Sequence, residues 1–233
     1  MAVDVRRANE RFHTEIGWLD SWHSFSFSSF YDPNNTHHGL LLVNNDDVIR
    51  GAGGFGQHGH ADMEIVTWVL EGALEHRDSL GTTGVITPGL AQRMSAGTGI
   101  RHSEQNASDV TDVHLVQMWV LPDTKGIAPS YEQRDLGDVS GQGLVPVASG
   151  RGHEGAVSIH QRDATLWVGK LRATESVTVP DAPHAHVFVA LGSAVLDGTA
   201  TLATGDAARL TDAGALTLTA DTADCEVLIW DTA

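Results

Sequence analysis

The 233-residue sequence has a single cysteine, Cys225, and only 14 lysine and arginine residues against 30 aspartate and glutamate residues, a formal net charge of −16. One cysteine excludes an intramolecular disulfide and any metal site built from several thiolates. The shortage of basic residues excludes direct nucleic-acid binding through phosphate contacts, and an anionic membrane surface would repel the chain. Any metal must therefore be bound by nitrogen and oxygen ligands.

Long hydrophobic runs are also missing from the sequence. No apolar stretch approaches the roughly 20 residues of a membrane-spanning helix, and the N-terminal segment lacks the apolar core of a signal peptide. We therefore expect a cytoplasmic protein without membrane contact. The acidic composition favours a soluble monomer.

Short runs of β-branched, aliphatic and aromatic residues recur along the chain, and no window keeps the apolar spacing of an amphipathic helix. Clear examples are residues 64–70, 113–121, 165–171 and 227–230. Segments rich in glycine, asparagine and aspartate separate the runs, and residues 44–47 (NNDD) are interpreted as a turn. Strands spaced by about 8 to 12 residues predict an all-β protein made of sandwiches or barrels.

The composition changes between residues 122 and 155, where glycine, proline, serine and aspartate dominate, and this segment is interpreted as an inter-domain connection. Each flanking half contains a His-x-His sequence followed by an apolar run, which suggests a duplicated β-unit. We expect an N-terminal domain at residues 1–125 and a C-terminal domain at residues 126–233.

Histidine is abundant, with 13 residues, and four potential ligands occur in pairs. His58 and His60 are two residues apart, as are His102 and Glu104. Side chains at i and i+2 of a β-strand share one face, so each pair can point to one centre. Two such pairs on neighbouring strands would give three imidazoles and one carboxylate, a set that suits Fe(II), Mn(II), Ni(II) or Cu(II) and leaves coordination positions open. Open positions indicate catalysis rather than a structural site.

These pairs belong to a longer stretch, residues 54–106, that contains HxH, EHRDSLG, MSAGTGI and HSE in this order. The stretch resembles the signature region of the pirin family, part of the cupin superfamily. The similarity extends to residues 17–33, to residues 126–133 and to the C-terminal half. The resemblance implies a bicupin, in which two double-stranded β-helix (jelly-roll) barrels pack together and the N-terminal barrel holds one metal ion.

The resemblance implies that the ligands of this ion are His58, His60, His102 and Glu104. It also implies one divalent transition metal per chain, usually Fe(II), with Mn, Ni, Cu, Co and Zn as alternatives. Glu64 is a competing carboxylate, because its spacing from the His-x-His pair is that of the broader cupin motif. In pirins the carboxylate comes from the HSE segment, so we expect Glu64 to be a neighbour of the site.

The C-terminal barrel of the family generally lacks metal. His184 and His186 resemble a relic of the first His-x-His pair, and no histidine follows them in the sequence. We therefore expect this barrel to bind no metal.

Two other groups of residues have alternative interpretations. His76, Arg77 and Asp78 in the EHRDS segment could orient the metal ligands, although an ion pair that stabilises a turn is the simpler interpretation. Five aromatic residues between positions 18 and 30 could shield a flat ligand, but core packing is the more common role of such clusters.

Several bacterial pirins are associated with quercetin 2,3-dioxygenase activity, in which O₂ opens a flavonol ring and carbon monoxide is released. The resemblance thus implies an iron-dependent dioxygenase that takes a flavonol-like aromatic substrate and O₂. Glu104 is the expected catalytic base, because the flavonol 3-hydroxyl must lose its proton before its oxygen binds the metal. A second hypothesis is a non-catalytic iron-binding redox sensor that regulates a protein partner. A third is a metal-assisted isomerase or hydrolase, since cupin barrels host many reactions.

Overall fold

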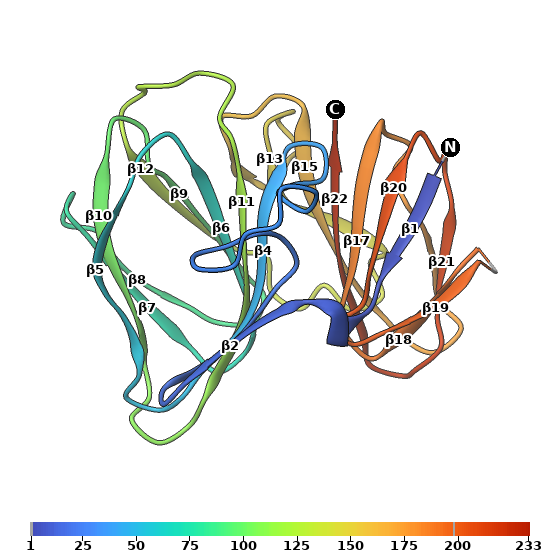
Figure 1. Ribbon diagram of the computed structural model, residues 1–233, viewed down its shortest axis with the longest axis horizontal. Coiled ribbons are helices and arrows are strands. Elements are labelled where there is room, and N and C mark those ends of the chain that lie inside the picture. The colour runs from blue at the N-terminus through green and yellow to red at the C-terminus, as the bar shows by residue number, and fades with distance from the viewer. Residues whose placement is uncertain (1, 198) are drawn as a thin grey trace.

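The computed structural model describes residues 2–197 and 199–233. Over these residues the chain forms β-strands and one short 3-10 helix, η1 (Ala8–Glu10), and no α-helix. The strands build two barrels that lie side by side (Figure 1). No helix in the described part of the chain is long and apolar enough to cross a membrane. The prediction of an all-β protein with two packed barrels is confirmed.

The N-terminal barrel is formed by a seven-stranded sheet and a four-stranded sheet. Its strands are β2 (Phe12–Ile16), β3 (Leu19–His23), β4 (Leu41–Ile49), β5 (Gly54–His60), β6 (Glu64–Glu71), β7 (Leu74–Asp78), β8 (Thr83–Ile86), β9 (Leu90–Ser95), β10 (Ile100–Asn106), β11 (Val113–Val120) and β12 (Ser130–Asp135). The larger sheet has the order β12-β9-β6-β11-β4-β3-β2, and the smaller sheet has the order β5-β10-β7-β8.

The C-terminal barrel repeats this arrangement. Its strands are β1 (Ala2–Arg6), β13 (Leu144–Ser149), β14 (Val157–Ser158), β15 (Ala164–Leu171), β16 (Ser176–Thr178), β17 (His184–Leu191), β18 (Ser193–Leu196), β19 (Ala200–Ala203), β20 (Ala207–Thr211), β21 (Thr217–Ala220) and β22 (Cys225–Thr232). The sheets have the orders β1-β20-β17-β22-β15-β13-β14 and β16-β21-β18-β19. Each strand therefore has a positional counterpart in the other barrel, as a duplicated unit requires.

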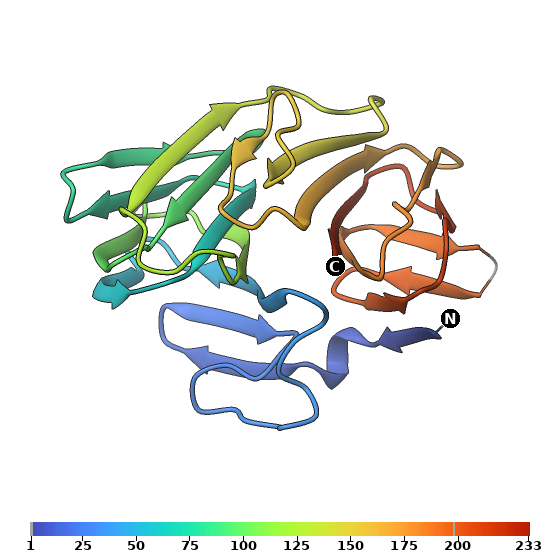
Figure 2. The same ribbon diagram turned by 90° about the horizontal axis from the view of Figure 1, so that it is seen from above.

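One edge strand of each large sheet lies on the other side of residue 125 from the rest of its barrel. Strand β1 pairs with β20 of the C-terminal barrel, although it is the first strand of the chain. Strand β12 pairs with β9 of the N-terminal barrel and lies in the glycine-rich segment that we interpreted as an inter-domain connection. Figure 2 shows the N-terminal segment running from one barrel to the other. Both strands thus pair across residue 125, and a division of the domains at this residue stays a prediction.

The two large sheets pack against each other through a shared apolar core. Trp68 of β6 lies in this core together with Phe188 of β17 and Trp230 of β22, and all three side chains are buried. Because alternate residues of a strand face opposite sides, His184 and His186 share the face of Phe188. These two histidines therefore lie on the outside of the C-terminal barrel, toward the N-terminal half.

The prediction of a turn at residues 44–47 is wrong, because these residues lie inside β4. This strand pairs with β3 on one side and with β11 on the other. Its polar side chains are buried but have partners: Asn45 Oδ1 lies 2.9 Å from His23 Nδ1, and Ser21 Oγ donates to Asp47 Oδ1. A strand interior accepts polar residues when neighbouring strands satisfy their hydrogen bonds.

Candidate metal centre

Three histidines converge on neighbouring strands of the smaller sheet in the N-terminal barrel. Strands β5 and β10 are antiparallel, and His102 is the direct cross-strand partner of His58. One ring nitrogen from each of His58, His60 and His102 lies within 4.8 Å of the others. Between the pairs His102/His58 and Glu104/Phe55, β5 has one residue more than β10. Such a bulge bends a strand and re-aims its side chains.

Glu104 belongs to a second group that shares His102 with the first. His76, His102 and Glu104 form a second group whose ligand atoms lie within 4.8 Å of one another. The Glu104 carboxylate is buried, and Gln117 Nε2 donates to its two oxygens at 3.1 and 2.9 Å. Trp119 Nε1 in turn donates to Gln117 Oε1 at 3.1 Å, which fixes the orientation of the amide. The structure thus places His58, His60 and His102 in one group and Glu104 with His102 in the other, and their binding of one ion stays a prediction.

A buried hydrogen-bond chain sets the tautomer of His102. His102 Nδ1 lies 3.4 Å from His76 Nδ1, and His76 Nε2 lies 3.3 Å from Asp78 Oδ2. A carboxylate only accepts hydrogen bonds, so His76 donates from Nε2 and accepts at Nδ1 from the His102 N–H. The remaining nitrogen, His102 Nε2, is then an unprotonated, buried atom without a hydrogen-bond partner in the structure. A metal ion fits this position, because a metal-bound imidazole normally donates its other N–H to a fixed acceptor.

Burial also keeps two of these imidazoles, His60 and His102, neutral. It lowers the pKa of His102 to about 2, and the neighbouring His58, His60 and His76 add to this effect. Burial and His58 lower the pKa of His60 to about 4. Burial raises the pKa of Glu104, and the Gln117 hydrogen bond partly offsets this. Neutral imidazoles offer the lone pairs that metal ions require, and a cation would stabilise the Glu104 carboxylate.

The competing carboxylate, Glu64, is bound elsewhere. Its Oε2 accepts hydrogen bonds from Ser95 Oγ at 2.8 Å and from the backbone N–H of His160 at 3.1 Å. Neither potential ligand group in the described part of the chain contains Glu64. It therefore lies apart from the cluster, at the side that faces the connection between the barrels.

The EHRDS segment divides between the two roles that the sequence left open. His76 lies against His102 and orients it, as described above. Arg77 instead points to the surface, where its Nε donates to Glu75 Oε1 at 2.5 Å. Asp78 has both roles. Its Oδ2 lies next to His76, and its Oδ1 accepts hydrogen bonds from the backbone N–H groups of Leu80 and Thr82 in the turn.

The expectation that the C-terminal barrel binds no metal stays a prediction, but its physical basis changes. The strands that correspond in position to β5 and β10 are β16 and β21, with the sequences SVT and TLTA. They contain no histidine and no acidic residue. His184 and His186 belong to β17, the counterpart of β6, so the interpretation of this pair as a relic of His58 and His60 is wrong.

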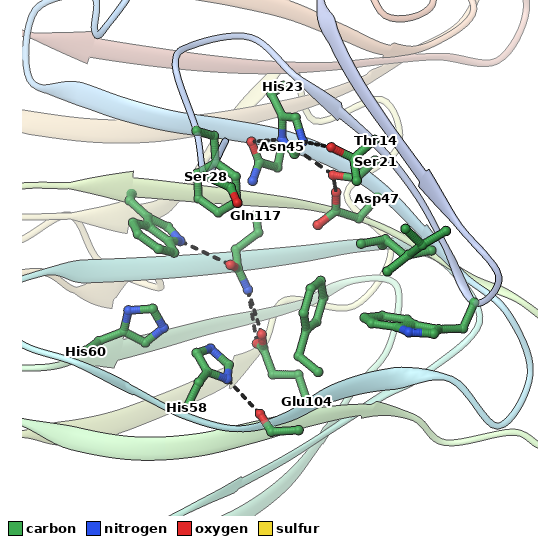
Figure 3. A pocket seen from close by; sticks show the side chains of 17 residues that line it. Thr14, Ser21, His23, Ser28, Asn45, Asp47, His58, His60, Glu104 and Gln117 are labelled. Carbon is green, nitrogen blue, oxygen red and sulfur yellow. Dashed lines mark hydrogen bonds between the residues drawn. The ribbon is translucent and has the colours of Figure 1, made fainter. Parts of the chain in front are cut away.

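A pocket of about 510 Å³ opens beside the cluster, a volume typical of small-molecule sites. His58, His60 and Glu104 lie on one side of it, as Figure 3 shows. Its apolar lining is provided by Ile16, Trp18, Leu19, Phe27, Phe55 and Trp119. Two members of the early aromatic group thus line the pocket. A third member, Phe25, belongs to the core between the barrels.

The side of the pocket opposite the histidines is a polar wall, formed by Thr14, Ser21, His23, Asn45 and Asp47 (Figure 3). Burial raises the pKa of Asp47 to about 7, although the hydrogen bond from Ser21 lowers this pKa. The sequence interpretation missed this wall. The signal was present, since Ser21/His23 and Asn45/Asp47 have the same i, i+2 spacing as the metal-ligand pairs.

The chain matches two family models. Residues 4–120 match the model "Pirin", and residues 146–232 match the model "Quercetinase C-terminal cupin domain". A protein of Mycobacterium tuberculosis named "Putative quercetin 2,3-dioxygenase" is 56% identical over 231 residues, which covers 98% of this chain and 94% of the relative. The Escherichia coli protein named "Quercetin 2,3-dioxygenase" is 44% identical and covers 98% of both chains.

Solved structures show the same architecture. The crystal structure of YhhW from Escherichia coli matches with a TM-score of 0.93 and 42% identity, covering 100% of this chain and 98% of YhhW. The structure of bacterial pirin YhhW in complex with nickel(II) matches with a TM-score of 0.91 and 42% identity over 99% of both chains.

Proposed function

Because the chain belongs to the pirin family, we propose that it is a metal-dependent dioxygenase that opens the ring of a flavonol-like substrate with O₂. The observation that carries this proposal is a group of three imidazoles, with the buried Glu104 carboxylate next to His102, beside an aromatic-lined pocket of about 510 Å³. The names of the two relatives described above support the reaction type. A pocket of this size also favours an enzyme over a non-catalytic redox sensor, which has no need to admit a substrate.

In this proposal His58, His60, His102 and Glu104 would hold one divalent ion. The nickel(II) complex of the Escherichia coli relative supports a divalent metal, and we propose Fe(II) as the ion here, with nickel(II) as the first alternative. When bound, such an ion supplies a redox-active Lewis acid with open coordination positions.

The residues of the chain would bind and orient the substrate. Trp18, Phe27 and Phe55 provide apolar ring contacts for a flat aromatic molecule. Asn45 and Asp47 on the polar wall present groups that can hydrogen-bond the hydroxyl groups of a flavonol. The substrate would thus lie with one polar end near Glu104 and another against the polar wall.

Glu104 is the proposed catalytic base, with its carboxylate oxygens as the proton acceptors. It lines the pocket between His58 and the polar wall, so a substrate hydroxyl can reach it. Gln117 holds the carboxylate in place by donating to both of its oxygens, and each oxygen keeps a further lone pair that can accept a proton. Glu104 would act as ligand and base at one position.

Anaerobic reconstitution with Fe(II), followed by quercetin and O₂, tests the proposal. Loss of flavonol absorbance is followed together with release of carbon monoxide. His60→Ala should lose bound iron and turnover together. His153→Ala is the matched control, since His153 bonds to Ser149 in the C-terminal barrel, and it should keep both.

Full turnover by a metal-free His60→Ala protein would overturn the proposal. One tightly held iron without turnover would favour the redox-sensor hypothesis instead. Turnover with carbon monoxide that depends on the metal would support the dioxygenase.

A further inference from the structure

A buried arginine without a carboxylate partner lies where the two barrels meet. Arg209 of β20 is 6% exposed. Its Nη2 donates to the backbone oxygen of Ser24 at 2.8 Å, and its guanidinium lies 4.4 Å from the centre of the Phe25 ring. Its Nε has no hydrogen-bond partner among the described residues, where no acidic side chain forms an ion pair with it. A buried cation of this kind is costly unless an anion compensates it.

His186 lies directly beside Arg209 and is also unsatisfied. The two residues are cross-strand partners on β17 and β20, so their side chains share one face of the sheet. His186 is 1% exposed, and neither ring nitrogen has a hydrogen-bond partner within the described chain. Burial lowers its pKa well below the ordinary value, with Arg209 as the next cause. The ring is therefore neutral and has one N–H to donate.

Arg209 and His186 line a cavity of about 30 Å³, which we call the inter-barrel cavity. Ser24 and Asn35 face it from the N-terminal barrel, and the segment after β1 closes it. A water molecule needs about 10–15 Å³ on this scale, so the cavity holds one small ion or about two waters. It is too small for a phosphate ester or a nucleotide.

Three other arginines line the inter-barrel cavity, but each is already neutralised. The ion pairs are Arg6–Asp4, Arg7–Asp206 and Arg11–Asp46. Glu10 also faces the cavity, and its Oε2 accepts a hydrogen bond from the Arg7 backbone N–H. Glu10 is the acidic side chain that lines the cavity among the described residues, and it is bound to a backbone amide rather than to Arg209. The uncompensated cation is Arg209.

We propose that the inter-barrel cavity binds a small monoanion, of the size of chloride or a carboxylate group, between Arg209 and His186. The Arg209 guanidinium supplies the charge and the free Nε–H, and the neutral His186 ring supplies a second N–H. Water alone could satisfy His186 and the unpaired Asn35 Oδ1, but it has no charge to compensate Arg209.

The position of the cavity gives the anion a structural consequence. Ser24 and Phe25 follow β3 of the N-terminal barrel, whereas His186 and Arg209 belong to the large sheet of the C-terminal barrel. A monoanion held between them would tie the two barrels together. The stability of the folded chain should then depend on the small anions in solution, because a ligand that binds only the folded state stabilises it.

Thermal unfolding of the metal-loaded protein at constant ionic strength tests this inference. Sodium chloride or sodium acetate replaces sodium gluconate stepwise, because gluconate is too large for the cavity. We expect a saturating rise in the melting temperature of about 2–4 °C. The anion that saturates at the lower concentration identifies whether a halide or a carboxylate fits better.

Arg209→Gln should abolish this dependence. Arg93→Gln is the matched control, since Arg93 is also a buried arginine, 5% exposed, but pairs with Glu132. The control should lower the melting temperature and keep the rise with chloride. A rise of equal size in Arg209→Gln would overturn the inference.

Wild-type crystals soaked in sodium bromide provide a test that needs no variant. An anomalous bromide peak between Arg209 and His186 would support the site. Ordered water there, with no anomalous peak, would overturn the inference even if Arg209→Gln failed to fold.

Discussion

Gln117→Leu tests how the buried carboxylate of the metal centre is held. Gln117 Nε2 donates hydrogen bonds to the two carboxylate oxygens of Glu104 at 3.1 and 2.9 Å. Leucine fills a similar volume but has no amide. A hydrogen bond to a charged group contributes about 1.5–3 kcal/mol. Since about 1.4 kcal/mol is a factor of ten, affinity for a divalent ion should fall about 10- to 150-fold, close to the range of about 10- to 100-fold found for outer partners of metal ligands.

The assay is a competition between the metal-free protein and a fluorescent chelator for nickel(II), which is stable in air. Gln142→Leu is the control, because Gln142 Nε2 donates to the backbone oxygen of Asp138 in the exposed segment before β13. It should bind nickel(II) like the wild type. An affinity of Gln117→Leu within threefold of the wild type would refute the reasoning that this amide fixes a metal-binding carboxylate.

Three further predictions follow from single side chains. His76→Leu removes the acceptor of the His102 Nδ1–H and should lower affinity for nickel(II) about 10- to 100-fold in the same competition; unchanged affinity would contradict the assigned tautomer. Burial raises the pKa of Asp47 from 3.8 to about 7, so the folded protein keeps a proton that the unfolded chain releases. In urea unfolding of the metal-free protein, the free energy of unfolding of the wild type should therefore fall relative to that of Asp47→Asn as the pH rises from 3.8 to 7. Above pH 7 the difference between the two proteins should stay constant. Equal pH profiles would contradict this. Arg77→Ala should leave both the melting temperature and metal affinity unchanged, because its partner Glu75 is on the surface; a large loss of metal would show that Arg77 orients the ligands after all.

The metal cluster was predictable because it depends on a short-range rule. Residues two apart on a strand share a face, and His58/His60 and His102/Glu104 each obey that rule. The remaining requirement was that β5 and β10 be neighbours, which the sequence alone does not state and the pirin resemblance implied. The role of His76 stayed open between orienting the ligands and forming an ion pair, because it depends on a third strand, β7, which places His76 against His102 through pairing with β10.

The turn wrongly expected at residues 44–47 shows where composition misleads. Asparagine and aspartate favour turns because their side chains satisfy nearby backbone groups. In β4 those side chains are satisfied across strands instead, with Asn45 bonded to His23 and Asp47 to Ser21. That pairing is long-range, so local propensity could not reveal it. The part of the polar wall that lies on β4 therefore had the local sequence pattern of a turn.

The two His-x-His sequences show that a motif has chemical meaning only with its place in the sheet. His58 and His60 lie on β5, whose neighbour β10 carries the other two proposed ligands. His184 and His186 begin β17, whose intervening residues face the core of the C-terminal barrel while the histidines face outward. On that outer face the cross-strand partner of His186 is Arg209, a cation that would repel a metal ion and attract an anion. In our two proposals, strand position thus gives one sequence pattern opposite electrostatic roles: a site for a cation inside the first barrel and a site for an anion between the barrels.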